Sequence, residues 1–399
     1  MAEAVEKLHP AGKWKVLPYK RVAALGLALL IAGCQTVVPK GKPPVRPTEP
    51  VVETPVGPGL PEDQLRHRVA LLVPMTGANA GVGQSIANAA NLAVLDTGGK
   101  QIRITTYDTA LGAGAAAQKA VAEGNKVILG PLLSDDVTAV APVARKASVP
   151  LISFSNDASV AGSGTYLLGY SPAQSIERVV DYARSRGATS FAGLMPTGVY
   201  GQRASTAMLR AVEGAGGRVV GMQSYDRSQR SIQEAVRKLS ETSAYDALMI
   251  ADGGGVAVQI VPLVRKGGAP GARILGTELW NTETSLANNP ALRGAWFASV
   301  SDGLYTQLST KYRTRYGKAP YRLSSLGYDA VLLVTRVARD WKVGTNFPVK
   351  MLNDPSGFAG IDGAFRFSKD GIAERALEVQ QIDAGKFSIV SPAPKAFGK

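Results

Sequence analysis

Several polar side chains stand directly after short apolar runs, where they could meet a bound ligand. They are Thr76, Ser134, Ser153, Ser155 and Asn156 in one half of the chain, Thr197, Tyr200 and Asp252 in the other, and Glu278 or Trp280 as further candidates. Hydroxyl groups and free backbone N–H groups at helix starts suit a carboxylate, because the helix N-terminus is positive. Asp252 is the best-placed acid to hold an ammonium group. The pattern predicts a binding cleft without identifying its ligand.

Each of these candidates also has an ordinary structural interpretation. Ser134 precedes two aspartates and fits an N-cap with an acidic first turn, which is the more common role. Ser155 and Asn156 are frequent turn formers. Trp280 fits core packing as well as a lid over a cleft. The triple glycine at 253–255 lacks the Lys and Ser/Thr of a phosphate-binding loop.

The residue inventory argues against catalysis. The chain has two histidines, His9 and His67, and one cysteine, Cys34. A Ser-His-acid triad would lack its central histidine in the body of the chain, and a zinc site would lack its usual His and Cys ligands. We therefore expect a binding protein that is not an enzyme and has no cofactor or metal.

Short apolar runs and amphipathic stripes alternate along the chain and must position these side chains. Residues 69–73, 127–129, 191–195 and 247–250, and 273–276 apart from Arg273, are apolar without polar alternation, which is typical of parallel strands covered on both faces. Between them, apolar residues recur at helical spacing, as at 86, 89, 90 and 93. The alternation restarts after Ser171-Pro172. The fold class is therefore α/β, with two doubly wound lobes joined by hinge crossovers.

The C-terminal part has a different pattern. Apolar residues at 326, 330, 333, 337 and 341 predict one long helix, and the segments 364–367 and 377–382 predict a hairpin and its continuation. The expected organisation is a signal peptide at 1–33, a tether at 34–66, lobe 1 at 67–171 and 302–345, lobe 2 at 172–301, and a C-terminal hairpin region and tail on lobe 2 at 346–399.

The N-terminal segment predicts export and lipidation. Lysines and one arginine precede an apolar run at 22–31 that is too short to span a bilayer as a helix. The run leads into Leu30-Ile31-Ala32-Gly33-Cys34, which resembles the bacterial lipobox. The resemblance implies cleavage before Cys34 and lipid attachment to it. Gln35 in the next position favours sorting to the outer membrane, because an Asp there would suggest retention in the inner membrane.

The segment after Cys34 is rich in proline and favours an extended chain over helix or sheet. About thirty such residues reach roughly 90 Å when fully extended. The formal net charge of the chain is +14. In an exported lipoprotein this charge suits acidic envelope polymers or anionic lipid rather than nucleic acid.

Several motifs together resemble the type I periplasmic binding proteins of the branched-chain amino acid class. They are VALLVPMTG at 69–77 with GVGQ at 81–84, ILGPLLS at 128–134, APVARKASVPLIS at 141–153, Tyr200-Gly201, and GIDGAFRF at 360–367 with Asp370-Gly371. The lipobox, the tether and GPLLS at 130–134 look most like the penicillin-binding protein activators within that superfamily.

That resemblance implies a lipid-anchored outer-membrane protein that faces the periplasm, where it binds and activates a bifunctional penicillin-binding protein and so regulates peptidoglycan synthesis. The chain departs from the best-known activators, because only the tether stands where they carry a helical repeat domain. The alternative is the solute-binding component of a transporter for branched-chain or related amino acids. A third interpretation is a structural lipoprotein that bridges membrane and peptidoglycan.

Overall fold

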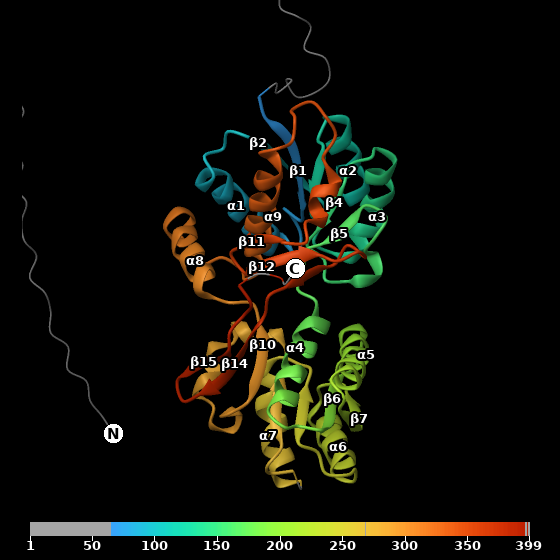
Figure 1. The fold of residues 1–399 in the computed structure, drawn as a ribbon, viewed down its shortest axis with the longest axis vertical. Coiled ribbons are helices and arrows are strands. Elements are labelled where there is room, and N and C mark those ends of the chain that lie inside the picture. The colour runs from blue at the N-terminus through green and yellow to red at the C-terminus, as the bar shows by residue number, and fades with distance from the viewer. Residues whose placement is uncertain (1–64, 268, 396, 398–399) are drawn as a thin grey trace, which may run out of the picture. The chain divides into compact units, whose positions relative to one another are not determined.

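The computed structural model describes residues 65–267, 269–395 and 397, and these form two α/β lobes (Figure 1). The expected α/β class with two lobes is therefore confirmed. The predicted signal peptide and nearly all of the predicted tether, including Cys34, lie outside the described residues. Within the part of the chain that is described, no helix has both the length and the hydropathy that a bilayer span requires.

Lobe 1 is built on a five-stranded parallel sheet in the order β2-β1-β3-β4-β5. Its strands are β1 (His67–Val73), β2 (Ile102–Asp108), β3 (Val127–Leu129), β4 (Leu151–Ser153) and β5 (Thr165–Leu167). Its covering helices are α1 (Ala80–Asp96), α2 (Ala113–Ala122), α3 (Ser134–Lys146), α8 (Gly303–Tyr316) and α9 (Ser324–Ala338).

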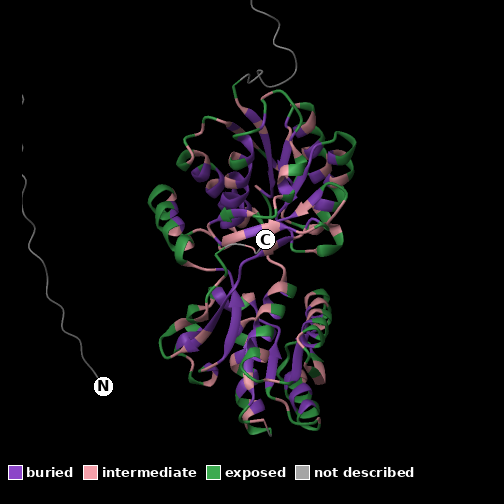
Figure 2. Ribbon diagram, in the orientation of Figure 1, coloured by how far each residue is buried: buried purple, intermediate pink, exposed green. Residues whose placement is uncertain are grey.

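Strand β1 shows why the central runs are entirely apolar. Val69, Leu71 and Val73 pack into a core with α1 and α9, whereas Ala70 and Leu72 pack into a second core with α2 and α3. Because both faces are covered, neither set of side chains can be polar. Figure 2 shows the strands of both lobes as buried and the helix surfaces as exposed.

Lobe 2 contains a seven-stranded sheet in the order β15-β14-β10-β9-β8-β6-β7. The strands β6 (Ser190–Pro196), β7 (Arg218–Tyr225), β8 (Ala247–Ile250), β9 (Arg273–Gly276) and β10 (Trp296–Ser299) are parallel, and β14 (Glu378–Asp383) and β15 (Lys386–Ser391) add antiparallel strands at one edge. The helices α4 (Pro172–Ser185) and α5 (Val199–Gly214) contribute to one core and α6 (Gln229–Ser240) and α7 (Gly254–Lys266) to the other.

The expectation that residues 346–399 belong to lobe 2 is wrong for the first part of this region. Strands β11 (Phe358–Gly360), β12 (Gly363–Phe367) and β13 (Ala373–Arg375) form a separate antiparallel sheet whose aromatic side chains pack into the core of lobe 1. Only β14 and β15 join lobe 2. The predicted hairpin and its continuation are confirmed, because β12 pairs with β13 across residues 368–372 and the chain then continues into β14.

Each lobe begins with the same tight packing of a strand against a helix. A Cβ on Gly83 of α1 would lie 1.8 Å from the carbonyl oxygen of Pro74, and one on Gly201 of α5 would lie 1.6 Å from that of Pro196. No side chain fits at either position. The glycine of the Tyr200-Gly201 motif is thus explained by packing.

Candidate functional site

The predicted residues of lobe 1 lie at the carboxyl edge of its sheet, but most of their polar groups have partners within the protein. Thr76 donates its hydroxyl to Asp108 Oδ2 at 2.6 Å. Ser153 is buried and donates to the carbonyl of Pro131 at 2.9 Å, and it accepts the backbone N–H of Ser155 at 3.0 Å. The Ser155 hydroxyl in turn accepts the backbone N–H of residue 157. These hydroxyls hold loops in place.

Ser134 and Asn156 also differ from the expectation. Ser134 is the first residue of α3, and the N-cap position is Leu133, so Ser134 makes no side-chain cap bond. Asn156 is exposed and lines a groove of about 610 Å³ that also contacts Arg203 of α5. Arg203 forms an ion pair with Asp157 at 2.6 Å, which joins lobe 2 to lobe 1 at this groove.

The predicted residues of lobe 2 lie at the carboxyl edge of its sheet. Thr197 is exposed and is held by a backbone hydrogen bond to Tyr225. Tyr200 is half-buried, with its hydroxyl 3.1 Å from Thr277 Oγ1 and donating to Glu278 Oε1 at 3.3 Å. Burial raises the pKa of Tyr200, so the phenol stays protonated. Trp280 is fully buried and belongs to the core, as its structural interpretation predicted.

Asp252, the acid expected to hold an ammonium group, is already paired. Its carboxylate accepts three hydrogen bonds from Nε and Nη2 of Arg227, one from the Tyr225 hydroxyl at 3.0 Å and one from the backbone N–H of Gly253 at 2.8 Å. The carboxylate is nearly inaccessible, with 6% of its side chain exposed. It is therefore not free to bind a ligand in this arrangement.

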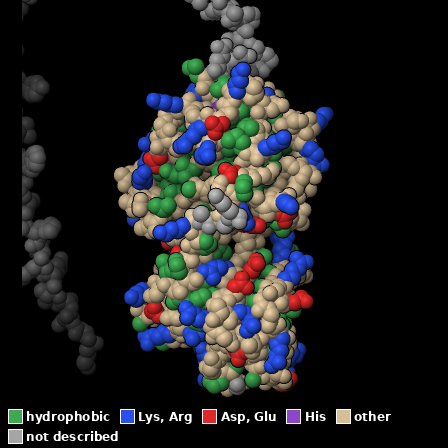
Figure 3. Space-filling view, in the orientation of Figure 1, with side chains coloured by type: hydrophobic (Ala, Val, Ile, Leu, Met, Phe, Trp, Pro, Cys, Tyr) green, Lys and Arg blue, Asp and Glu red, His purple; other side chains and the backbone are tan. Residues whose placement is uncertain are grey.

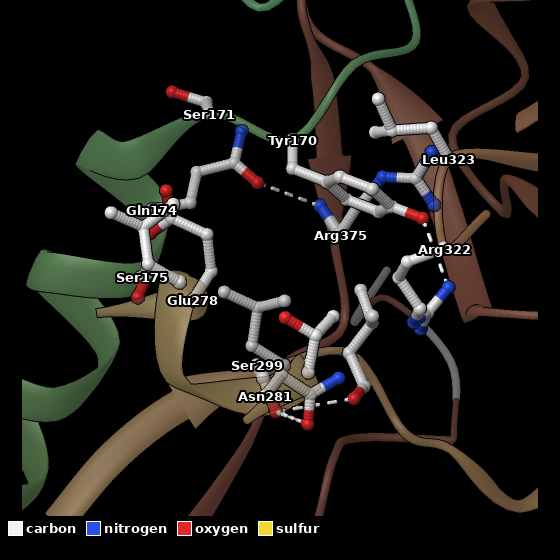
Figure 4. Close-up of a pocket in the computed structure, with 14 residues that line it drawn as sticks. Tyr170, Ser171, Gln174, Ser175, Glu278, Asn281, Ser299, Arg322, Leu323 and Arg375 are labelled. Carbon is white, nitrogen blue, oxygen red and sulfur yellow. Dashed lines mark hydrogen bonds between the residues drawn. The ribbon is translucent and has the colours of Figure 1, made fainter. Parts of the chain in front are cut away.

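A cavity of about 210 Å³ lies where the chain crosses between the lobes (Figure 4). All three connections reach it: the link from β5 to α4, the link from β10 to α8, and the link from β13 to β14. The polar residues around it are Tyr170, Ser171, Gln174, Ser175, Glu278, Asn281, Thr282, Ser299, Arg322 and Arg375, and the apolar ones are Leu279, Val300, Leu323 and Leu377.

Glu278 supplies the most unusual group of this cavity. Its Oε1 accepts the Tyr200 hydroxyl, whereas its Oε2 is sealed from solvent and has no hydrogen-bond partner in the described protein. Burial raises the pKa of Glu278 to about 7. The carboxyl group is therefore poised to change charge near neutral pH, and it could accept a donor from a small bound molecule.

Arg322 holds the opposite side of the cavity. Its Nη1 donates to the buried carboxylate of Asp362 at 2.7 Å, and its Nη2 lies 3.2 Å from Asp302 on the link from β10. Asp302 accepts an amide N–H of Asn281 at 3.1 Å. Asn281 belongs to lobe 2, so a continuous chain of polar contacts connects the two lobes through this cavity.

Arg375 and Gln174 add a second connection. The Gln174 side chain accepts the backbone N–H of Arg375 at 3.0 Å and donates to the carbonyl of Ala373 at 2.7 Å (Figure 4). Gln174 lies on α4 of lobe 2, while Arg375 packs its guanidinium against Tyr170 of the first crossover. The hinge is thus held by side chains from both lobes.

None of the eight predicted cleft residues lines this cavity, and of the two further candidates only Glu278 does. Sequence reasoning missed Gln174, Arg322 and Arg375, whose spacing in the chain gives no sign that they meet. The only available signal was the predicted restart of the alternation after Ser171-Pro172, which marks a crossover between the lobes. Among the described residues, no group of three or more His, Cys, Asp or Glu side chains is arranged to hold a metal ion.

Known proteins share this two-lobed architecture. The family described as periplasmic binding protein matches residues 67–386. A putative branched-chain amino acid ABC transporter from Rhodospirillum rubrum superposes with a TM-score of 0.70 at 21% identity, over 82% of this chain and 100% of that one. The LpoA (YraM) C-domain from Haemophilus influenzae, a regulator of PBP1A, superposes with a TM-score of 0.66 at 20% identity, over 81% of this chain and 99% of that one.

One curated relative also matches. It is an uncharacterized protein of Rickettsia prowazekii, 26% identical over 184 residues, which are 46% of this chain and 49% of that protein. The match thus spans about half the length of that relative. At these identities the solved structures establish the shared fold.

Proposed function

Because this chain belongs to the periplasmic binding protein family, we propose that it acts by binding, and that its partner is a bifunctional penicillin-binding protein. It would regulate peptidoglycan synthesis by binding the active state of that synthase more tightly than the inactive state, since only differential affinity shifts an equilibrium between two states.

The paired state of Asp252 is the observation that carries this proposal. A receptor for amino acids needs an available acid for the ligand's ammonium group. Here the best-placed acid is occupied by Arg227, Tyr225 and a backbone N–H. The hydroxyls of Thr76, Ser153 and Ser155 are also used inside the protein. An edge whose polar groups are satisfied is better suited to contact another protein than to surround a charged solute. The likeness to the LpoA C-domain, a regulator of PBP1A, supports the same partner class.

Site-specific crosslinking in cells tests the proposal. A photoreactive amino acid replaces Leu111 or Val199, which are exposed at the carboxyl edges of the two sheets, and matched controls carry it at Leu95 or Ile389. Adducts are purified and identified by mass spectrometry. We expect a bifunctional penicillin-binding protein from the edge positions and not from the controls. Recovery of transporter permease subunits from the edge positions would refute the proposal.

A small-solute receptor is the second candidate, and the cavity at the hinge favours it. The unpartnered Oε2 of Glu278 would accept a hydrogen bond from a ligand donor in a space of about 210 Å³. Isothermal titration calorimetry with a panel of branched-chain and related amino acids tests this function. Micromolar or tighter binding that Glu278→Gln abolishes would establish a receptor, and an absence of heat with every compound would leave the synthase proposal favoured.

The anchoring of the chain is part of the proposal. Lipid on Cys34 would attach the protein to the outer membrane on its periplasmic side, and the proline-rich segment would connect lipid and body. Direct contact with peptidoglycan would add a structural role. Sedimentation with isolated sacculi at high salt tests that contact, because charge attraction alone is screened under those conditions.

A further inference from the structure

The charges of lobe 1 are divided between two opposite edges of its sheet. The loops at the carboxyl edge contain Asp108, Asp135, Asp136 and Asp157. The segments 69–99, 104–118, 127–144 and 147–171 contain no Lys or Arg at all. In a chain with a net charge of +14, this leaves the carboxyl edge acidic and gathers the cations of lobe 1 elsewhere.

Six cations of lobe 1 lie at the amino edge of the same sheet, whereas Lys311, Arg313 and Arg315 lie on α8. We define the basic pole as Lys100, Lys119, Lys126, Lys146, Arg339 and Lys342. Lys100 lies two residues before β2 and Lys126 directly precedes β3, while the other four stand in the last turns of α2 and α3 or just after α9. Because the strands are parallel, their starts share one edge. Figure 3 shows Lys and Arg side chains spread over the upper end of this face.

Contacts around the start of β1 confirm that these segments meet. The His67 ring stacks on Trp341 with centroids 3.7 Å apart, which fixes the segment after α9. The backbone N–H of His67 bonds the carbonyl of Gln101 at 2.8 Å, and that of Lys126 bonds the carbonyl of Arg68 at 3.0 Å. Lys100, Lys126 and Lys342 are therefore neighbours of these fixed positions.

The basic pole is exposed, and the acids near it have partners of their own. Five of its six residues are exposed, and Lys126 is half-buried. Asp96 pairs with Lys311 at 2.9 Å. Glu123 accepts the Tyr107 hydroxyl and also lies 4.0 Å from Lys119, so it neutralises part of the pole. Asp340 lies 3.7 Å from Arg336. These contacts reduce the number of acids available to neutralise the pole.

Favourable interaction with helix ends explains the positions of only some of the cations in the basic pole. Cations in the last turn interact favourably with the helix dipole, which accounts for Lys119 and Lys146. Lys100 and Lys126 precede strands, and Lys342 lies four residues beyond the end of α9. The helix account does not cover these positions, so a partner for the whole surface is the better explanation.

The attachment point of the N-terminal segment identifies that partner. Leu65, the first described residue, lies two residues before β1 at this edge, so the segment that carries Cys34 joins the body here. We propose that the basic pole binds an anionic phospholipid surface and directs the acidic carboxyl edge of lobe 1 away from the membrane. The orientation rests on the lipid anchor of the proposed function, whereas the binding does not. Each basic residue near such a surface adds to the attraction, which falls within a Debye length.

The test uses the full chain carrying Cys34→Ser, so that binding does not depend on lipidation. Its binding to vesicles of phosphatidylcholine with and without phosphatidylglycerol is measured by co-sedimentation. The pole variant carries Lys100→Glu, Lys119→Glu, Arg339→Glu and Lys342→Glu. The control variant makes the same change of charge on exposed residues of lobe 2 with Arg210→Glu, Arg218→Glu, Arg230→Glu and Lys266→Glu. Residues 1–33 are common to all, so their contribution cancels.

We expect the parent to bind the anionic vesicles. The affinity of the pole variant for them should be at least about tenfold lower, and that of the control variant should fall by about threefold at most. Equal losses in both variants would mean that only net charge matters and would overturn the proposal. Binding to isolated sacculi without binding to vesicles would overturn it in favour of the cell wall. Circular dichroism verifies that each variant is folded. The crosslinking of the proposed function does not depend on either result, so the two can fail separately.

Discussion

Arg227 and Asp252 form a two-point ion pair at the carboxyl edge of lobe 2. Nε of Arg227 lies 2.9 Å from Oδ2 of Asp252, and Nη2 lies 3.1 Å from Oδ1. Arg227 adopts a positive φ of 69°, a conformation that L-residues with side chains rarely take. Arg227 thus combines a strained backbone conformation with the ion pair that occupies the Asp252 carboxylate.

The pair predicts an ordering of two substitutions at position 227. Arg227→Ala removes the partner of a buried carboxylate and keeps a side chain at positive φ, so we expect a loss of about 1–2 kcal/mol in the free energy of unfolding. Arg227→Gly also removes the partner but tolerates the positive φ, and we expect it to be about 1 kcal/mol more stable than Arg227→Ala. Urea denaturation measures both. Equal stabilities would show that the backbone conformation at 227 costs nothing.

Glu278 predicts a dependence of stability on pH. Burial raises its pKa in the folded protein to about 7, above the ordinary value near 4.5 in the unfolded chain. The folded state therefore binds more protons, and the stability from this group is fully present below pH 4.5 and is lost as the pH rises to about 7. The loss amounts to about 3 kcal/mol at most. Glu278→Gln should reduce the slope of the unfolding free energy between pH 4.5 and 7.5, while buried Asp329, whose pKa is also raised, keeps its own contribution. A variant with the same slope as the parent would contradict the assignment.

The ion pair between Asp157 and Arg203 predicts a change in the motion of the lobes. The pair joins them at 2.6 Å, so Arg203→Ala should broaden the distribution of distances between the lobes. Spin labels at Leu111→Cys and Leu209→Cys in a Cys34→Ser background report that distribution by double electron–electron resonance, since the chain has no other cysteine. Arg210→Ala serves as the control, because Arg210 lies on the same helix and forms no ion pair within the described part of the chain. An unchanged distribution with Arg203→Ala would show that the hinge contacts alone hold the lobes.

The sequence was sufficient to predict the strands and the two lobes because burial on both faces leaves an unmistakable apolar run. The runs at 127–129, 247–250 and 273–276 coincide with β3, β8 and β9. Alternation near the C-terminus was less informative. It predicts that one face of a strand is buried but not which core buries it, and so β12 was placed on the wrong lobe.

The site was predicted less well, because whether a polar side chain is free to bind a ligand depends on which other side chains contact it in the folded protein. Asp252 was located at the correct strand end, but its partner Arg227 lies 25 residues away and nothing in the sequence links them. Arg322 and Asp362, which are separated by 40 residues, meet beside the hinge cavity in the same way. A sequence pattern predicts that a polar residue stands at an edge, and it does not predict whether another side chain occupies it.

Cys34→Ser predicts the loss of membrane anchoring. Each buried acyl CH₂ contributes about 0.8 kcal/mol, and more than one acyl chain is needed for stable attachment. Without the thiol no lipid can be attached at this position, so the variant should appear in the soluble periplasmic fraction while the parent fractionates with the outer membrane. Intact mass spectrometry of the parent should show the added lipid on a chain that begins at Cys34. The basic pole should give the variant only weak membrane attachment that is removed by high salt. A variant that stays with the outer membrane after a high-salt wash would show that another part of the chain anchors it.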